Sequence, residues 1–224
     1  MAGAIAVVLG VNPDLTWRDV KHILAVTART IDPGRTEVRA AFNGVPYVGQ
    51  HAWQTNAADH DFHNWYGLGA IDVDSAVALA ASYAPGRLGT FVESPWFQTG
   101  ADETLPLAIP DVDGAGVDAV VEVTGLPQAA DIEAVVLEVA VEHTNALDLG
   151  SILRSPADTT SVLNPPFSAV LEDFPGLRIW QLLSNAFLSE NPNGAWTEHV
   201  ADLAAEDTGQ LTAWRLRFYY GDHP

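Results

Sequence analysis

The sequence predicts an α+β protein, with a helical first part that ends near Pro85 and an all-β sandwich or jelly roll that begins after Gly89. Two observations support this division. Apolar residues recur at helical spacing in the first part, and they alternate with polar residues in the second. Hydrophobic residues make up 48% of the chain and charged residues 17%, which is the composition of packed globular domains. We therefore expect two folded units.

Three helices are expected before Pro85. Residues 2–9 are apolar on every side, which favours a buried helix, and Gly10 with Asn12-Pro13 ends it. The second helix begins at Thr16, where Asp19 three positions later completes a capping box. Its predicted apolar face consists of Trp17, Val20, Ile23, Leu24 and Thr27. The third helix begins at Asp74 and ends at Tyr83.

The stretch from Asp32 to Trp65 is rich in Gly, Pro, Asn and aromatic residues, which indicates a long loop or a short hairpin. Residues 85–89 are the expected domain boundary. After Gly89, residues 135–142 and 214–218 alternate apolar and polar side chains, as half-buried strands do. Further strands are predicted at Phe91 to Gln98, Thr104 to Ile109, Val117 to Thr124, Gly150 to Ser155, Ile179 to Leu183 and Trp196 to Val200. Alternation places Trp180, Trp196 and Trp214 in the core of the sandwich rather than in a sugar-binding groove.

The chain is strongly acidic. It has 29 Asp and Glu against 10 Lys and Arg, a formal net charge of −19, and Lys21 is its sole lysine. Such a surface repels nucleic acid and anionic membranes and attracts cations. The absence of cysteine excludes disulfides and thiolate metal sites. The apolar stretch at residues 2–11 is too short to span a bilayer and has no basic leader.

Two stretches of the first part resemble the catalytic domain of the kexin-like, or proprotein convertase, branch of the subtilisin serine proteases. Leu15-Thr16-Trp17-Arg18-Asp19-Val20 follows Asn12-Pro13 and is similar to the region after the helix of the nucleophilic serine. Trp65-Tyr66-Gly67-Leu68-Gly69-Ala70-Ile71-Asp72 is similar to the segment that closes the catalytic domain, and Trp53, Asn56 and Ala57 also match.

The second part resembles the P domain that follows the protease in this family. The matching stretches, in order, are residues 141–144, 148–149, 153–156, 161–163, 190–197 and 209–216. The resemblance implies that residues 1–86 are a truncated helical remnant of an α/β subtilisin domain and that residues 87–224 are a β-sandwich or jelly-roll P domain. It also implies a secreted or extracellular parent protein, exported in the bacterial manner.

No catalytic residue is expected in the chain itself. Serine proteolysis needs a nucleophile, a base and an orienting group, and the motifs that supply them in subtilisins are absent. Met1-Ala2-Gly3 is similar to the sequence just downstream of the catalytic serine, so the intact parent is expected to be a serine endopeptidase and this piece inactive. Ser75, Ser82 and Ser94 lie outside any Gly-x-Ser-x-Gly turn. No cofactor-binding residue is predicted.

The candidate metal ligands are acidic residues near the turns of the P domain. The resemblance indicates structural calcium at Asp148, Asp173, Glu190 and Asp202, with solvated surface carboxylates as the alternative. Asp111, Asp113 and Asp118 favour a plain β-turn, because the glycines do not fit an EF-hand. His51, His60 and His63 with Asp59 and Asp61 suggest a metal cluster, but surface or packing histidines are favoured there.

Three functional hypotheses remain open from the sequence. In the first, the P domain stabilises a catalytic domain that cleaves a protein or peptide substrate, and the upstream catalytic segment is the partner of this chain. In the second, the sandwich is a non-catalytic module that binds a protein partner or calcium. In the third, Met1 is an internal residue of a longer reading frame. The apolar opening segment also predicts self-association, or poor order, for residues before Pro85.

Overall fold

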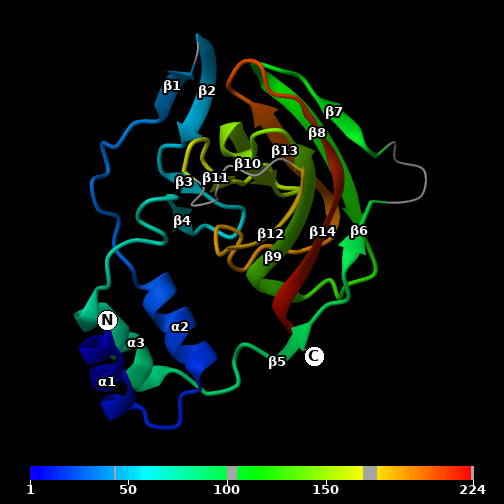
Figure 1. Ribbon diagram of the computed structural model, residues 1–224. Helices are drawn as coiled ribbons and strands as arrows, with labels where there is room; N and C mark the ends of the chain where they lie inside the picture. Colours follow the sequence, from blue (N-terminus) through cyan, green and yellow to red (C-terminus); the bar gives the residue numbers. More distant parts are fainter. Residues whose placement is uncertain (43, 100–104, 169–175, 223–224) are drawn as a thin grey trace.

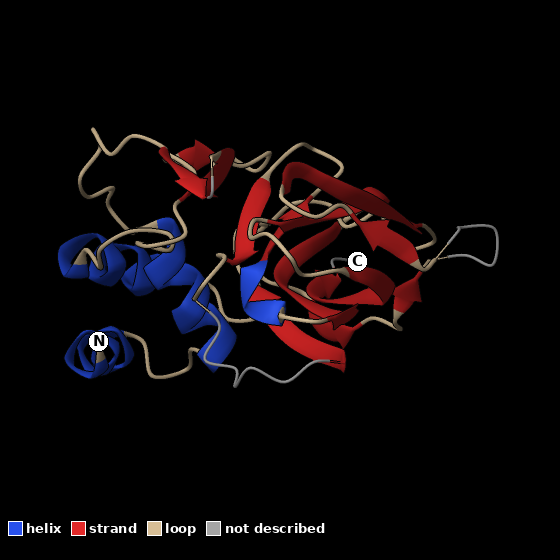
Figure 2. Cartoon of the chain, turned by 45° about the horizontal axis from the view of Figure 1, so that its top comes forward, coloured by secondary structure: helices blue, strands red, loops and turns tan. Residues whose placement is uncertain are grey.

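A computed structural model of the chain places three helices beside a two-sheet β-structure (Figure 1). The structure describes residues 1–42, 44–99, 105–168 and 176–222. Figure 2 shows the helices gathered on one side of the strands, with the long strands curved around a common interior. Among the described helices, none is long and apolar enough to cross a membrane.

The helices α1 (Ala2–Val11), α2 (Trp17–Val26) and α3 (Val73–Ser82) begin close to the predicted positions. The capping box predicted for α2 is confirmed: Asp19 N donates to Thr16 Oγ1 at 3.2 Å, and Asp19 Oδ2 accepts from Thr16 N at 2.8 Å. The α3 helix starts one residue earlier than expected. Asp72 is its N-cap and accepts a hydrogen bond from Ser75 N at 3.0 Å.

The helices form a small core of their own that covers one face of α1. Val8 of α1 is fully buried in it, and Ile5 packs against its edge. The other buried members are Leu15, Val20, Ile23, Ala76, Ala80 and Tyr83. On the opposite face of α1, Val7 is 50% exposed and Val11 43% exposed. The prediction that α1 is buried all round is therefore only half met within the described residues.

Trp17 departs from its predicted place on the apolar face of α2. Its side chain is 64% exposed, and the indole contacts the ring of Phe91 edge-on at 5.7 Å between centroids. Phe91 lies on β5 (Thr90–Glu93), far along the chain. The prediction was wrong because helical spacing reveals only which residues of one helix share a face. It does not reveal contacts with distant segments, and the Trp17 indole packs against Phe91 of β5 instead of the helical core.

The β-structure consists of two antiparallel sheets that face each other (Figure 1). One has four strands in the order β11-β10-β13-β8, with bounds Thr160–Asn164, Leu149–Arg154, Gly194–Asp202 and Asp113–Val123. The other has the order β12-β9-β14-β5, with β12 at Gly176–Ser184, β9 at Ala130–His143 and β14 at Gly209–Asp222. The short strands β6 (Phe97–Gln98) and β7 (Leu107–Ile109) pair with β14.

The predicted strands are thus found, with two adjustments. The stretch from Phe91 to Gln98 is divided into β5 and β6, because Pro95 between them has no N–H to donate to the sheet. The predicted turn at Asp113-Gly114 coincides with the start of β8. Thr104, the first residue of another predicted strand, lies outside the described residues.

The interior between the two sheets is built from the alternating apolar residues. Trp196 is fully buried, contacts Phe187 edge-on at 4.9 Å, and lies 5.2 Å from Phe218. Trp214 is also in this core and Trp180 packs against it, so all three tryptophans take the predicted interior role. The two sheets therefore enclose a hydrophobic core between them, whereas one face of α1 is left uncovered.

The stretch from Asp32 to Trp65 contains two small antiparallel pairs. A hairpin joins β1 (Val38–Phe42) to β2 (Val45–Gln50), and β3 (Gln54–Thr55) pairs with β4 (Asp61–Phe62). This agrees with the prediction of a long loop or short hairpin. A 3₁₀ turn at Ala146–Asp148 precedes β10.

Candidate functional site

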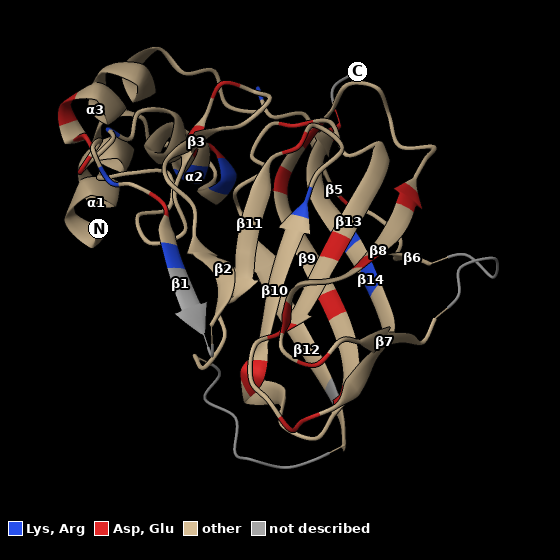
Figure 3. Ribbon diagram, turned by 90° about the horizontal axis from the view of Figure 1, so that it is seen from above, with Lys and Arg blue, Asp and Glu red and all other residues tan. Residues whose placement is uncertain are grey.

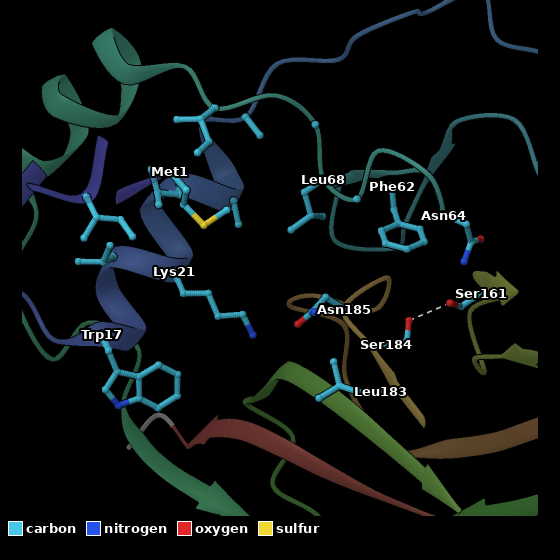
Figure 4. Close-up of a pocket in the computed structure, with 18 of the residues that line it drawn as sticks. Met1, Trp17, Lys21, Phe62, Asn64, Leu68, Ser161, Leu183, Ser184 and Asn185 are labelled. Carbon is cyan, nitrogen blue, oxygen red and sulfur yellow. Dashed lines mark hydrogen bonds between the residues drawn. The ribbon is translucent and has the colours of Figure 1, made fainter. Parts of the chain in front are cut away.

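A groove of about 760 Å³ lies between the helices and the β-sandwich. Figure 4 shows that Trp17 and Lys21 reach it from α2, whereas Leu183, Ser184 and Asn185 close it from the end of β12. The loop at residues 62–71 and part of β11 form the remaining wall. We call this surface the inter-unit groove, because both parts of the chain line it.

The lining of the inter-unit groove is mainly apolar. The apolar lining residues are Met1, Ile5, Leu9, Leu15, Trp17, Val20, Leu24, Ala25, Ala28, Phe62, Leu68, Ile71, Val162, Leu163, Leu182 and Leu183. Of these, Met1 is 84% exposed and Leu183 57% exposed. An open apolar surface of this kind is typical of a site that another polypeptide covers.

The polar groups of the groove are mostly satisfied within the chain. Asn64 Nδ2 donates to Val162 O at 2.7 Å, and Ser184 Oγ donates to Ser161 Oγ at 2.9 Å (Figure 4). Lys21 Nζ donates to Glu133 O at 2.6 Å, and burial lowers the pKa of this lysine. Asn185 differs from these groups, because its buried Oδ1 accepts no hydrogen bond from the described residues. The groove thus offers a partner a wide apolar contact with one unused acceptor.

An ion pair joins α2 to the sandwich next to the groove. Arg18 Nε lies 2.9 Å from Glu133 Oε1 and 3.2 Å from Oε2, and Arg18 Nη2 also donates to Oε1. The same guanidinium donates to Leu88 O and Gly89 O, both at 3.0 Å. The N–H groups of this one guanidinium therefore join α2 to β9 and to the segment at Leu88 and Gly89 that connects the two parts of the chain.

Asn56 makes a second link between the two parts. Its Nδ2 donates to Ala186 O at 3.0 Å and to Leu188 O at 2.9 Å, while its Oδ1 accepts from Ala58 N and His60 N. The side chain is 4% exposed. The loop before β4 is thereby fixed to the segment between β12 and β13.

Two of the predicted calcium ligands come together. Leu149 lies opposite Asp202 in the β10–β13 register, and Leu203 N donates to Asp148 O at 3.2 Å. Asp148 is 3% exposed and Asp202 is fully buried. Asp148 Oδ2 is buried without a hydrogen-bond partner among the described residues. Burial, followed by the charges of Asp202 and Asp207, raises the pKa of Asp148 to about 6.

His143 is the basic neighbour of this pair. Its Nε2 lies 3.2 Å from Asp202 Oδ2, and its Nδ1 lies 2.9 Å from Asn145 O. Burial alone lowers the pKa of His143, but the hydrogen bond and charge of Asp202 outweigh it and raise that pKa above its ordinary value. The raised pKa favours the protonated form of His143, whose charge offsets part of the negative charge of the two carboxylates.

The other predicted ligands do not join them. Glu190 Oε1 accepts from Thr159 Oγ1 and from Ala57 N, the latter at 3.1 Å, so this carboxylate links the residue just before β11 to the loop before β4. Asp173 lies outside the described residues. Within residues 1–42, 44–99, 105–168 and 176–222, no three His, Cys, Asp or Glu side chains gather closely enough to hold a metal ion.

The histidines of the first part serve packing, as the sequence favoured. His63 is fully buried, stacks on Tyr66 at 4.7 Å, and lies 5.3 Å from the Trp53 ring. His60 Nε2 lies 3.3 Å from Ser189 Oγ. His63 thus packs among aromatic rings and His60 contacts Ser189, so the two imidazoles have separate surroundings.

Sequence reasoning missed Glu133 and Glu198. Glu133 interrupts an apolar run at residues 132–137, a signal that identifies a buried charge but not its partner. Glu198 is fully buried in β13 and accepts a hydrogen bond from Ser151 Oγ at 2.5 Å. Alternation along β13 places Glu198 on the same inward face as Trp196 and Val200, which is the signal that could have identified it.

Comparisons with known proteins identify the second part directly. Residues 132–218 match the model of the proprotein convertase P-domain. The chain is 32% identical over 219 residues to an extracellular serine protease of Aeromonas sobria, covering 91% of this chain and 34% of that protein. It is 28% identical over 239 residues to human proprotein convertase subtilisin/kexin type 6, covering all of this chain and 22% of that protein.

The solved structures agree with these relatives. The crystal structure of the Aeromonas sobria serine protease superposes with a TM-score of 0.84 at 28% identity, over 97% of this chain and 42% of that one. The same protease in complex with its chaperone gives a TM-score of 0.84 at 29% identity, over 99% of this chain and 43% of that one. The chain thus spans between about a fifth and two fifths of the length of these relatives. Residues 132–218 therefore carry a P-domain of the proprotein convertase type, and the chain as a whole is similar to serine proteases of the subtilisin/kexin kind.

Proposed function

We propose that the chain is the C-terminal portion of a subtilisin-type serine endopeptidase, in which residues 1–86 close the catalytic domain and residues 87–224 form the P domain that stabilises it. The observation that carries this proposal is the inter-unit groove, an apolar surface of about 760 Å³ lined by both parts of the chain. The upstream part of a catalytic domain is the occupant that fits it.

Two further observations support this occupant. The α1 helix buries Val8 but leaves Val7 and Val11 exposed, so the surface that a second layer would cover is still open. The relatives are more than twice as long as the part that this chain spans, and the match to the Aeromonas protease runs through both parts. The peptidase activity would then belong to the longer protein, and its export would follow that of the extracellular relative.

A chimaera tests the proposal. The preceding part of the Aeromonas sobria protease is joined to residue 1, and peptide hydrolysis, its inhibition by a serine-directed reagent and the melting temperature are measured. We expect hydrolysis that the reagent abolishes. Leu183→Asp, in the groove, should lower the melting temperature by several degrees, because it places a charge in the covered interface.

Ile179→Asp is the matched control. Ile179 lies on the same strand, is 65% exposed and does not line the groove, so this variant should behave like the parent chimaera. Equal effects of the two substitutions would contradict the proposed interface. A folded chimaera without hydrolysis, combined with saturable binding of a protein by the chain alone, would favour a non-catalytic binding module instead.

We further propose that Asp148 and Asp202 bind a structural calcium ion. The supporting observation is the buried Asp148 Oδ2 without a partner among the described residues, next to a second buried carboxylate. Calcium takes six to eight oxygen ligands, so backbone carbonyls and water would have to complete the set. Glu190 is left out, because Thr159 and Ala57 already engage its Oε1.

Calcium titration followed by thermal unfolding tests this site. Calcium should raise the melting temperature of the wild-type chain, and Asp148→Asn should remove that rise while Glu190→Gln retains it. Magnesium serves as the control cation, since it demands a smaller octahedral site. A melting temperature that does not respond to calcium would refute the proposal.

A further inference from the structure

A second groove lies between the β1–β2 hairpin and the outer face of the four-stranded sheet. It has a volume of about 310 Å³ and is lined by residues of β1, β2, β8, β10, β11 and β13. Figure 3 shows the hairpin beside the β10–β11 side of the sandwich, with basic residues in blue on β1 and at the end of β10. We call this surface the hairpin groove.

Close backbone approach fixes the walls of the hairpin groove. Tyr47 of β2 is 4% exposed, and its ring lies directly over Gly150, where any side chain would collide with it. A Cβ atom on Gly114 would lie 2.7 Å from Pro46 O. The hairpin therefore sits against the sheet at two glycine positions, and the groove between them is preformed.

Basic side chains face the groove from both walls. The hairpin side supplies Arg39 and His51, and the sheet supplies Arg154 and His199. This gathering is unusual in a chain with 29 acidic and 10 basic residues, whose overall field repels anions. Asp118 also lines the groove, so its charge is closer to neutral than that of the strongly acidic protein as a whole.

The charges of these basic groups are not equally compensated. Arg39 Nε lies 2.5 Å from Glu37 Oε1, and His199 Nδ1 lies 2.8 Å from Asp118 Oδ1. Arg154 has no ion-pair partner among the described side chains. It stands opposite Thr160 on β11 and Thr197 on β13, so its neighbours across the sheet are hydroxyl groups.

We propose that the hairpin groove binds an oxyanion, either a carboxylate or a phosphate, held by Arg154 with the help of Arg39. A guanidinium presents a planar pair of N–H donors that matches two oxygens of such a group. The Thr197 hydroxyl, directly beside Arg154, is a further donor. The alternative is that these arginines are simply solvated on the surface. A solvated surface arginine needs no opposing wall, whereas Tyr47 and Pro46 hold the hairpin against the sheet and give this groove two fixed walls.

Calorimetric titration of the whole chain at low ionic strength tests the proposal. One arm uses inorganic phosphate and the other a short peptide with two adjacent glutamates. We expect saturable binding at millimolar concentrations in at least one arm, weakened by added salt. Binding of phosphate alone assigns a small-anion site, and tighter binding of the peptide assigns an acidic segment as the natural occupant.

Arg154→Gln should weaken the binding about tenfold or more, because one charge-assisted hydrogen-bonding group is lost. Arg29→Gln is the matched control, since Arg29 is exposed and lies outside the groove. The melting temperature of each variant confirms that it is folded. Equal weakening by the two substitutions, or no saturation in either arm, would overturn the proposal.

Discussion

Arg18 and Glu133, 115 positions apart in the sequence, form the ion pair that fastens the helical part of the chain to the P-domain sandwich. Both side chains are nearly buried, with 13% and 10% of their surface exposed. The pair lies beside Lys21, whose ammonium donates to the backbone of the same glutamate. The two parts are therefore joined by specific charged contacts and not by apolar packing alone.

Removing one partner of this pair should be costly, because the other is left buried without compensation. We expect Arg18→Met or Glu133→Gln to lower the free energy of unfolding by about 3 kcal/mol. The double variant should lose less than the sum of the two, which a double-mutant cycle in urea measures. Arg29→Met, at an exposed position, is the control and should have little effect. Strictly additive losses would show that the pair contributes nothing.

Asn56 offers a test of the second link. Asn56→Asp replaces the Nδ2 donor by an oxygen, so Ala186 O and Leu188 O lose their partner and a charge is buried. We expect a loss of about 3 kcal/mol in the free energy of unfolding, measured by chemical denaturation. The same kind of change at an exposed amide, Gln98→Glu, should leave the stability nearly unchanged. Similar losses at both positions would indicate a general charge effect.

The parts of the fold that depend on local sequence were predictable, and the contacts between distant segments were not. The Thr16–Asp19 capping box and the alternation of β9 and β14 involve neighbours in the sequence, so spacing alone reveals them. The burial of Glu133 follows from a run of apolar residues, but its partner Arg18 lies on another element. The prediction for Trp17 was wrong for the same reason, because its indole packs against Phe91 on a distant strand.

The candidate site shows the same limit. The resemblance to the family selected Asp148 and Asp202 among many acidic residues, and strand pairing between β10 and β13 brings these two together. It also selected Glu190, which hydrogen bonds to Thr159 and Ala57 instead. The two grooves could not be read from the sequence, since each is a space between elements that pair or pack only in the folded chain.

Glu198 predicts a specific pH dependence of stability. Burial raises its pKa to about 8 from 4.5, with the Asp118 charge adding to the rise and the Ser151 hydrogen bond opposing it. Below pH 4.5 the folded and unfolded chains both hold the proton. Between pH 4.5 and 8 only the folded chain retains it, so the free energy of unfolding falls with rising pH, by about 1.4 kcal/mol per pH unit at most.

The loss is complete above pH 8, where both states are ionised. Glu198→Gln removes the proton exchange, so its stability relative to the wild type should rise across the same pH window. Urea unfolding at several pH values measures the difference, with the exposed Glu142→Gln as control. Parallel stability curves for wild type and Glu198→Gln would contradict this assignment.

Self-association of the chain follows from the exposed face of α1. Val7 and Val11 present apolar surface that the helical core does not cover, while the net charge of −19 opposes the approach of a second copy. Added salt screens that repulsion but leaves the apolar contact, so the average mass in analytical ultracentrifugation should increase with ionic strength. The double substitution Val7→Glu and Val11→Glu should suppress the increase. Val73→Glu, at a 38% exposed position on α3, should not.

The chimaera with the upstream protease segment distinguishes this association from a native dimer. If the exposed face of α1 is the surface that the catalytic domain covers, the chimaera stays monomeric at every salt concentration. A chimaera that still associates, and that loses the association on Val7→Glu and Val11→Glu, would place the α1 face outside the proposed catalytic interface. The inter-unit groove takes Ile5 and Leu9 of α1, whereas the exposed face takes Val7 and Val11, so the two measurements probe different sides of one helix. The proposed function stands where both report coverage by the upstream segment.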